Sequence, residues 1–172
     1  VQILAKLRPA FRKEGGSVTA GNSSGLNDGS AALLLANESG LSSSGLTPLA
    51  QIISSAVVGV EPRIMGIGPV HASEIALKRA GITFSDLDVI ELNEAFSAQT
   101  LACIRAWGLD DDDSRINPNG GGISIGHPLG VTGSRILLSA ARQLERTGGK
   151  YGLVTLCIGV GQGYAVVIKN TQ

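Results

Sequence analysis

The chain has 172 residues, of which 43 % are hydrophobic and 3 % aromatic, and its 14 basic and 14 acidic side chains give a formal net charge of zero. This length suits one domain or a large piece of a larger fold, with a core of aliphatic side chains. The neutral balance argues against nucleic acid as a partner, and no apolar run reaches the roughly 18 residues of a membrane span. No signal peptide is visible, and a removed one would leave no trace in this sequence. We expect an intracellular protein, and the sequence does not distinguish cytoplasm, mitochondrion and peroxisome.

Metal and disulfide chemistry find little support in the residue counts. The two cysteines, Cys103 and Cys157, lie far apart in the sequence and are too few for a secreted disulfide framework. Neither His71 nor His127 pairs with them at metal-ligand spacing. We therefore expect no metal site, and the sequence leaves open whether the two thiols meet.

The first third of the chain alternates loops with short apolar runs. Residues 1–13 have the pattern of a helix end, and residues 14–29 form a stretch rich in Gly, Ser, Asn and Asp that is typical of a loop. The run AALLLAN at 31–37 is expected to be buried, as a strand or a helix, because periodicity alone does not separate the two. The β-branched stretch 49–60 predicts a strand.

The rest of the chain predicts a regular alternation of helices and strands. Gly81 suits the end of a helix in which Ile75, Ala76 and Ala80 share a face. A long helix follows later, with Leu129, Gly133, Ile136, Leu137, Ala140 and Leu144 on one face. In chain order the predicted elements are a helix over 69–81, a strand over 86–93, a helix over 94–108, the long helix over 128–149, and strands over 151–160 and 163–169. This order indicates a layered α/β fold.

The segment GGGISIGHPLG places His127 directly before a proline at the start of the long helix. Pro128 suits the first turn of a helix, and a helix N-terminus disfavours positive charge beside it. A neutral imidazole there can take a proton from a thiol or donate a hydrogen bond to an oxyanion. The alternative is a capping histidine beside a tight turn.

The segment CIGVGQG begins at Cys157, where a strand ends among glycines. Glycines leave backbone N–H groups accessible to an oxyanion, although a buried structural cysteine in a hairpin is the simpler alternative. A strand-like run follows, whereas a dinucleotide-binding loop needs a helix there. Cys103 has no glycines around it, and we interpret it as a packing residue.

The segment NEAF lies at a strand-to-helix junction. Asn93 either caps the helix or belongs to the group of side chains that bind ligands just past the ends of strands. Glu94 is interpreted as a first-turn helical residue rather than as a base.

Together with VTAGNSSGLNDG, these three segments resemble the C-terminal half of thiolases in order and spacing, from about Gly16 to Lys169. The combination is far more specific than any one segment, and it favours the functional interpretation of each. Two departures are mild. Gly122 stands where most thiolases have alanine, and His71 stands where many have proline.

The resemblance implies a thiolase-like layered α/β fold, in which helices cover a mixed sheet. It also implies acyl transfer between coenzyme A thioesters through an acyl-cysteine, with no cofactor beyond these substrates. In such a site His127 would activate the nucleophilic cysteine, Asn93 would hold a water of the oxyanion hole, and Cys157 would be the acid/base at the acetyl methyl carbon. The other positions carried over are Gly159, for a second oxyanion hole, and Ser24 and Met65, for contacts to coenzyme A and the acyl group.

The nucleophilic cysteine of thiolases lies in a Cys-Gly-Ser/Ala-Gly segment of the N-terminal half, and neither cysteine of this chain has that context. We expect residues 1–29 to end a loop region, residues 30–37 to form a strand of the N-terminal-half sheet, and residues 38–172 to form the C-terminal domain. The chain alone would then be inactive, with the N-terminal half as its partner and a homo-oligomer as the full-length state.

Two other classes of function remain to be weighed against a thiolase. A non-catalytic module that binds acyl-CoA or acts as a scaffold needs no acid/base pair, so the presence of His127, Cys157 and Asn93 together favours the enzyme. A nucleotide-binding oxidoreductase is disfavoured because a strand, not a helix, is predicted after GVGQG.

Overall fold

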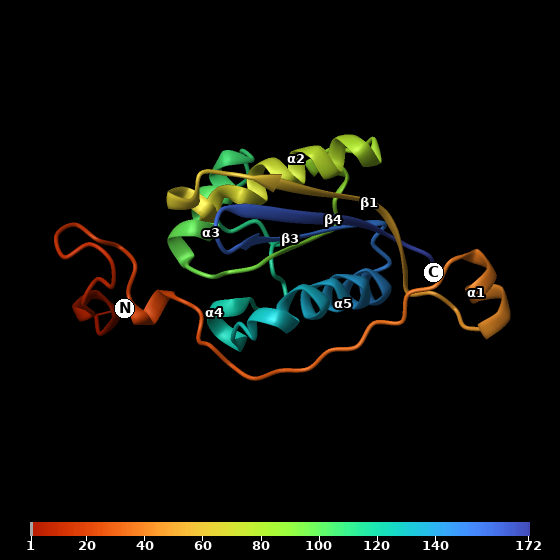
Figure 1. The fold of residues 1–172 in the computed structure, drawn as a ribbon, viewed down its shortest axis with the longest axis horizontal. Coiled ribbons are helices and arrows are strands. Elements are labelled where there is room, and N and C mark those ends of the chain that lie inside the picture. Colours follow the sequence, from red (N-terminus) through yellow and green to blue (C-terminus); the bar gives the residue numbers. More distant parts are fainter. Residues whose placement is uncertain (1) are drawn as a thin grey trace.

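Four strands form one mixed sheet at the centre of the molecule, in the order β1-β4-β3-β2 (Figure 1). A computed structural model of the chain describes residues 2–172. β1 (Ala50–Gly59) pairs antiparallel with β4 (Gln162–Asn170), which pairs antiparallel with β3 (Tyr151–Ile158). β3 is parallel to β2 (Val89–Leu92). The hairpin and both other strands confirm the sequence prediction.

Helices cover both faces of this sheet. α2 (Gly68–Ala80) and α3 (Ser97–Ala106) lie on one face, and α5 (Leu129–Thr147) lies on the other (Figure 1). The sheet is therefore covered on both faces, which explains why all four residues of β2 are buried. Three of them are apolar, and the fourth is Glu91. The remaining short elements are η1 (Leu4–Lys6), η2 (Ala20–Asn22), α1 (Glu38–Ser44), η3 (Pro62–Ile67), η4 (Phe84–Asp86) and α4 (Gly122–Ile125).

The molecule has two hydrophobic cores, one on each face of the sheet, and successive residues of a strand point alternately into one and the other. Ile90, Leu92 and Leu153 point to the side of α2 and α3, together with Cys103. The alternate positions point to α5, where the buried cluster consists of Val89, Val154, Ile168, Ile136, Ala140, Ala141 and Leu144. This period-two alternation decides which strand-end side chains reach which side of the sheet.

Two details of the predicted helix faces were wrong. Gly81 ends α2 with a φ of +69°, as predicted, but the buried side of that helix is Ala72, Ala76 and Leu77, and Ile75 is 38 % exposed. In α5 the first-turn Leu129 is 64 % exposed, so the buried stripe begins only with Thr132 and Ile136.

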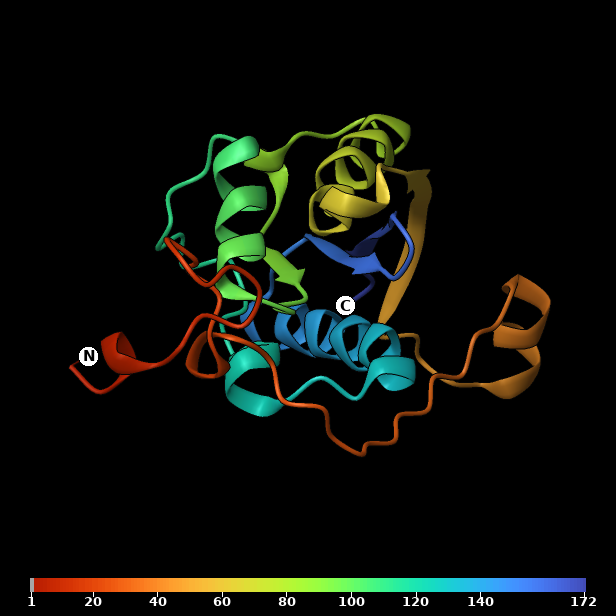
Figure 2. The same cartoon turned by 60° about the vertical axis from the view of Figure 1, so that its left-hand side comes forward.

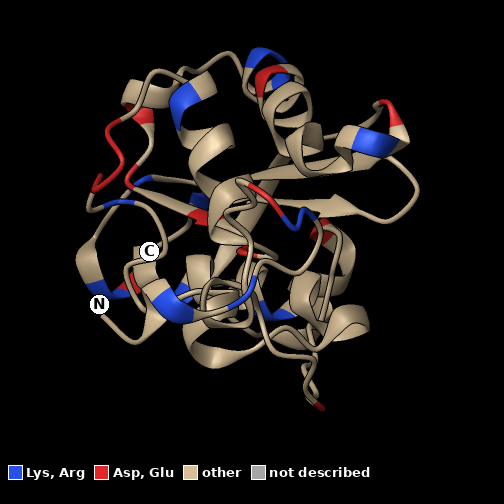
Figure 3. Ribbon diagram, turned by 90° about the vertical axis from the view of Figure 1, so that its left-hand side faces the viewer, with Lys and Arg blue, Asp and Glu red and all other residues tan. Residues whose placement is uncertain are grey.

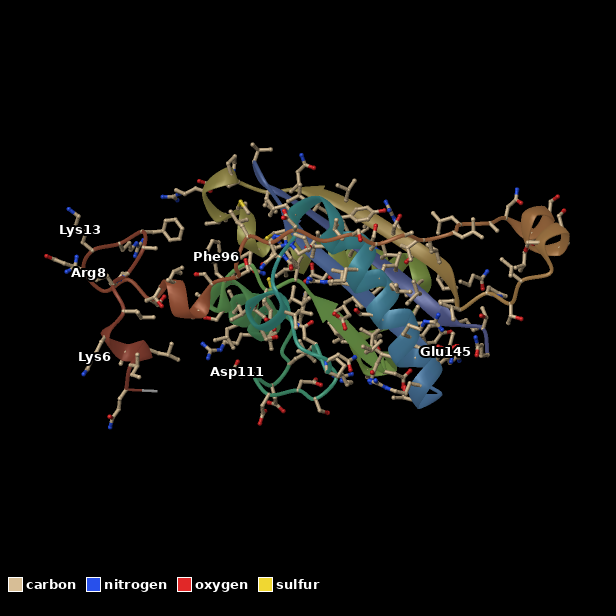
Figure 4. The ribbon with its side chains drawn as sticks, turned by 90° about the horizontal axis from the view of Figure 1, so that it is seen from below. Lys6, Arg8, Lys13, Phe96, Asp111 and Glu145 are labelled. Carbon is tan, nitrogen blue, oxygen red and sulfur yellow. The ribbon has the colours of Figure 1, made fainter. Side chains whose placement is uncertain are left out.

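The predicted helix end over residues 1–13 was also wrong, as far as the described residues 2–13 show. Only a single 3₁₀ turn, η1, forms there, and it buries no residue. Pro9 interrupts any continuation, and Phe11 is 73 % exposed apart from an edge-on contact with the ring of Phe96, at a centroid distance of 5.7 Å. Figure 4 shows this arm, with Lys6, Arg8 and Lys13, at the edge of the molecule beyond Phe96. Local periodicity did not decide this segment, because its few apolar contacts bury none of the side chains of η1.

The run AALLLAN is extended and exposed rather than buried. Residues 31–37 belong to no strand or helix, and Leu34 and Leu35 are 80 % and 71 % exposed. Figure 2 shows this part of the chain passing below α4 and α5, away from the sheet. The assignment of residues 30–37 to the sheet of another half stays a prediction.

Candidate active site

Asn93 and Cys157 lie at the carboxyl ends of two adjacent parallel strands. The Asn93 N–H donates to the carbonyl of Thr155 at 3.0 Å, which extends the β2–β3 ladder by one residue. Cys157 follows two residues further along β3. This edge of an α/β sheet is where such folds bind ligands. The helix-capping alternative for Asn93 is excluded, because α3 begins at Ser97 with Phe96 at its N-cap.

Hydrogen bonds on both ring nitrogens orient His127. The Asn93 side-chain amide lies 3.3 Å from Nε2, and the Thr132 hydroxyl lies 2.7 Å from Nδ1. The same hydroxyl donates to the carbonyl of Pro128 at 3.1 Å. Since a hydroxyl has one proton, it must accept from Nδ1–H, and Nε2 therefore carries the lone pair. The ring binds two side chains and no backbone N–H of α5, so it is not a helix cap.

The pKa of His127 is lowered, chiefly by burial and secondarily by the guanidinium of Arg135. The sequence predicted a neutral imidazole from its place at a helix start. The protonation state agrees, but the causes are burial and a neighbouring cation. Arg135 has a second effect, because its Nη1 donates to the carbonyl of Gly126 at 2.8 Å and so holds the residue before the histidine.

The NSSGLNDG segment packs directly against His127. The His127 N–H donates to the carbonyl of Gly25 at 2.9 Å and to Asn27 Oδ1 at 3.3 Å. Ser24 reaches the NEAF segment, because its N–H donates to the carbonyl of Ala95 at 3.0 Å. Gly126, with a φ of +94°, leaves no room for a Cβ beside Asn27. Sequence reasoning missed Asn27, although its place in an Asn-Asp-Gly run was an available signal.

Cys157 is a buried thiol, 8 % exposed, on the same side of β3 as Leu153. Burial raises its pKa. Burial has this effect because a thiolate is less stable than a neutral thiol away from water. The thiol is protonated at neutral pH, which suits a proton donor.

Cys103 behaves as a packing residue, as the sequence indicated. It is fully buried in α3, its thiol donates to the carbonyl of Gly66 at 3.4 Å, and burial raises its pKa to about 11. That contact also places η3, and with it the half-buried Met65, against α3. Both cysteines are free thiols.

Gly159 lies in the turn between β3 and β4. It is exposed, and the space beside its Cα is open. The next residue, Val160, has a φ of +62° and is 81 % exposed. Within residues 2–172 no hydrogen bond joins Cys157, Gly159, Ser24 or Met65 to the His127 ring, so the structure directly joins only Asn93 and His127 of the predicted site residues.

Glu94 is not a first-turn helical residue, since it precedes α3. Its carboxylate accepts hydrogen bonds from the Asn117 side chain at 2.8 Å and from the Ile123 N–H at 3.2 Å. The residue therefore links the NEAF segment to the glycine segment before His127.

The described part of the chain contains neither an evident metal site nor a helix for a bilayer. Among residues 2–172, no three His, Cys, Asp or Glu side chains cluster in a way that could hold a metal ion. No helix in that range combines the length and apolar character that crossing a membrane requires. Basic and acidic residues are interspersed on the ribbon of Figure 3 rather than gathered in one field of a single sign.

Comparisons with known proteins agree on one family. The model of the thiolase C-terminal domain matches residues 46–170, and that of the thiolase N-terminal domain matches residues 1–39. A β-ketoadipyl-CoA thiolase of Acinetobacter baylyi is 55 % identical over 167 residues, which are 97 % of this chain and 41 % of that protein. The 3-oxoadipyl-CoA/3-oxo-5,6-dehydrosuberyl-CoA thiolase of Escherichia coli is 53 % identical over 170 residues, 99 % of this chain and 42 % of that protein.

Solved structures agree with this family. The crystal structure of human mitochondrial 3-ketoacyl-CoA thiolase has a TM-score of 0.95 at 49 % identity, covering 99 % of this chain and 43 % of the human chain. The chain thus spans about two fifths of the length of the relatives it matches. A domain match over most of the chain, relatives above half identity and the same arrangement of strands and helices lead to one conclusion: the chain belongs to the thiolase family.

Proposed function

We propose that the chain provides the C-terminal part of an active site that transfers acyl groups between coenzyme A thioesters. The observation that carries this proposal is the hydrogen-bonded series from Asn93 through His127 to Thr132. It holds a neutral imidazole, whose Nε2 lone pair accepts a hydrogen bond from the Asn93 amide, at the edge of the sheet where Cys157 also lies.

His127 acts first in this proposal. In the degradative direction, a 3-ketoacyl-CoA and coenzyme A give acetyl-CoA and a shortened acyl-CoA through an acyl-cysteine. Nε2 takes the proton of the attacking thiol, and a positioned base of this kind contributes roughly 10²–10⁴-fold to the rate. The lowered pKa keeps the imidazole in its proton-accepting form near neutral pH.

Asn93 supports an oxyanion hole in the same proposal. Its Oδ1 is buried without a hydrogen-bond partner in the protein, and a buried acceptor of this kind is costly unless it is satisfied. A water held there would have its own proton to direct at the oxygen of a bound thioester. Such preorganised donors stabilise the negative charge that develops during acyl transfer.

Cys157 provides the carbon acid/base. Because burial keeps its thiol protonated, the thiol can deliver a proton to the carbon that becomes the methyl group of acetyl-CoA, which leaves Cys157 as a thiolate. In the reverse condensation that thiolate takes a proton from the acetyl methyl carbon and becomes the thiol again. The Gly159 N–H would serve the second oxyanion hole, and Ser24 and Met65 would contact the coenzyme A arm and the acyl group. The substrates themselves carry the reactive groups, so the proposal needs no cofactor.

The nucleophilic cysteine comes from an N-terminal half in this proposal. The match of residues 1–39 to the thiolase N-terminal domain supports such a connection, as do the exposed side chains of Leu34 and Leu35. The assembled protein would be a homo-oligomer. Relatives at this identity are named as β-ketoadipyl-CoA thiolases, so 3-oxoadipyl-CoA is the first ketoacyl substrate to assay.

The test is complementation. The 172-residue chain is co-expressed with the N-terminal part of the Acinetobacter baylyi relative that the chain does not match, and loss of the ketoacyl absorbance is followed with 3-oxoadipyl-CoA and coenzyme A. We expect no turnover from the chain alone, turnover from the assembled protein, and a loss of roughly 10²–10⁴-fold with His127→Ala. Turnover by the chain alone, or an undiminished rate with His127→Ala, would refute the proposal.

A further inference from the structure

The side-chain amide of Asn117 makes the hydrogen bonds that a neighbouring strand would make with the outer edge of β2. The backbone of residues 115–117 pairs with that edge first, because the Ile90 N–H donates to the carbonyl of Arg115 at 2.8 Å and the Asn117 N–H donates to the carbonyl of Ile90 at 2.9 Å. At Leu92, two residues further along β2, the side-chain amide of Asn117 replaces the backbone as the hydrogen-bonding partner. Its Oδ1 accepts from the Leu92 N–H at 2.9 Å, and its Nδ2 donates to the Leu92 carbonyl at 2.8 Å.

The backbone of Asn117 makes this substitution possible. Its φ is +47°, a left-handed conformation that asparagine tolerates better than most residues with a side chain. The main chain therefore turns away from the sheet into the Pro118 segment, while the side chain stays in register with β2. Both backbone groups of Leu92, the residue immediately before Asn93, are fixed in this way.

Glu94 extends the contact to the segment that carries His127. The Nδ2 of Asn117 also donates to Glu94 Oε1 at 2.8 Å, and Glu94 Oε2 accepts from the Ile123 N–H at 3.2 Å. A Cβ at Gly121 would collide with this carboxylate, so the glycine segment closes directly over it. Ile123 belongs to α4, which leads through Gly126 to His127.

One connected set of hydrogen bonds therefore reaches the neighbours of both site residues. We propose that Asn117 and Glu94 are positioning residues that set the distance between the Asn93 amide and His127 Nε2. At 3.3 Å this contact is at the long end of the hydrogen-bond range, so a displacement of a few tenths of an ångström breaks it. Asn117 and Glu94 do not themselves touch the imidazole. The effect on catalysis rests on the proposed function, whereas the effect on the His127 environment does not.

The direction in which the pKa of His127 moves distinguishes a lost Asn93 contact from a changed charge. A donor on Nε2 favours the neutral ring, so losing the Asn93 contact raises the pKa. The charged group that acts directly on His127 is Arg135 of α5, which lowers its pKa. Two carboxyl groups belong to the same surroundings: Glu91 interacts with Arg135 and with Glu94, and burial raises the pKa of Glu91 to about 7. Removing the negative charge of Glu94 would by itself lower the pKa, which is the opposite direction.

The primary experiment is a ¹⁵N NMR titration of His127 in the chain, with Asn117→Gly and Glu94→Gln as variants. Glycine accepts the left-handed φ but removes the amide, and glutamine keeps the size of Glu94 but can accept from only one of its two donors. In both we expect the pKa of His127 to rise by roughly 0.5 to 1. Asp112→Asn is the matched control: it removes an exposed charge beside the same 620 Å³ cavity that Glu94 lines, and should leave the titration unchanged.

A double-variant cycle tests whether the two side chains act together. Both single changes break the hydrogen bond from Asn117 Nδ2 to Glu94 or weaken it, so we expect the shift in the pKa of His127 in Asn117→Gly combined with Glu94→Gln to be smaller than the sum of the two single shifts. Additive shifts would mean that the two side chains act independently, and would overturn the proposal.

The second experiment measures acetyl transfer in the assembled protein. We expect kcat to fall about 10- to 100-fold in Asn117→Gly and Glu94→Gln, while KM changes by less than about 3-fold, because positioning acts on the reacting groups rather than on substrate binding. If the wild-type assembly is inactive, the proposed function fails and the titration still decides the positioning role. An unchanged His127 titration with a lowered melting temperature would show that the pair serves only stability. If one of the two variants does not fold, the titration of the other decides the positioning role.

Discussion

At the scale of single residues, burial controls the protonation of three groups near the strand ends. It lowers the pKa of His127, raises that of Cys157, and raises that of Glu91 to about 7. The three shifts share a cause and differ in sign only because burial disfavours whichever form is charged. The directions of the shifts favour a neutral, proton-accepting His127 and a protonated Cys157 thiol at neutral pH.

Replacing each cysteine by alanine should have clearly different effects on activity. In the assembled protein, Cys157→Ala should abolish exchange of acetyl-CoA methyl protons with deuterated water, because that exchange needs a carbon acid/base. Acylation by acetyl-CoA needs none and should survive in part. Cys103→Ala, which removes an equally buried thiol from α3, is the control and should change neither rate by much. Loss of proton exchange in the Cys103 variant instead would reverse the assignment.

Glu91 makes the stability of the fold depend on pH. Its folded-state pKa of about 7 lies above the value of 4.5 for a free glutamate, chiefly because of burial. The folded state therefore holds a proton that the unfolded state has released, and this stabilisation is complete below about pH 4.5 and is lost as the pH rises through about 7. Glu91→Gln should remove the dependence, with an advantage over wild type that grows to the order of 3 kcal/mol by pH 8.

Urea unfolding at several pH values, at low protein concentration, measures this difference. Glu145→Gln is the control: that carboxylate is solvent-facing and already ionised beside Arg142, which lowers its pKa. The control should show no gain across the same range. Parallel curves for wild type and Glu91→Gln would mean that Glu91 is ionised in the folded protein.

At the scale of elements, the β3–β4 hairpin contains a strained residue. Val160 has a φ of +62° and is 81 % exposed, and a β-branched residue in the left-handed region costs roughly 1–2 kcal/mol. Val160→Gly should raise the free energy of unfolding by roughly 0.5–1 kcal/mol, after allowing for the greater freedom of glycine in the unfolded chain. Denaturant midpoints measure the change.

An exposed valine in an ordinary strand provides the matched comparison. Val57 of β1 is 62 % exposed and extended, so Val57→Gly should destabilise the fold by a similar amount. Two Val→Gly changes of opposite sign would assign the effect to the backbone of Val160. A loss of stability in both would show that the turn does not store strain.

The elements that could be predicted from sequence are those whose signal is local. The amphipathic pattern of α5, the glycine that ends α2 and the glycines between β3 and β4 each lie within one segment. The exposure of residues 31–37 depends on what covers them, and no local pattern contains that information.

The candidate site shows the same division. The types of residue at His127, Asn93 and Cys157 indicate their chemistry, and their order along the chain indicates the family. The hydrogen bond between Asn93 and His127 joins positions 34 residues apart, and the contact of Asn27 with His127 spans 100. Such pairings follow from the packing of the whole domain, so the partners of Asn27 and Asn117 are seen only in the structure.

At the scale of the whole molecule, the N-terminal arm leaves apolar surface without a partner. Leu34 and Leu35 are both largely exposed, and burying a leucine stabilises a protein by roughly 1.5–3 kcal/mol. The isolated chain should therefore self-associate, and adding the N-terminal half should suppress this and protect residues 31–36 from hydrogen exchange.

Light scattering with hydrogen exchange on the purified chain measures both effects. Leu34→Ser combined with Leu35→Ser is the informative variant, since it should reduce self-association without touching the described core. A monodisperse wild-type chain in which residues 31–36 are already protected would contradict this expectation.

The strand order also bears on how the protein emerges from the ribosome. In this sheet β1 pairs with β4, and Ala50 pairs with Asn170, which is synthesised 120 residues later. β4 lies between β1 and β3, so β1 cannot join the sheet before β4 is made. At a synthesis rate of about 5–20 residues per second, β1 is exposed for on the order of ten seconds before its partner exists. Neither helix layer has a complete sheet to pack on during that interval. The fold therefore closes only when its last strand arrives, and a ribosome that stalls before β4 leaves a nascent chain dependent on chaperones.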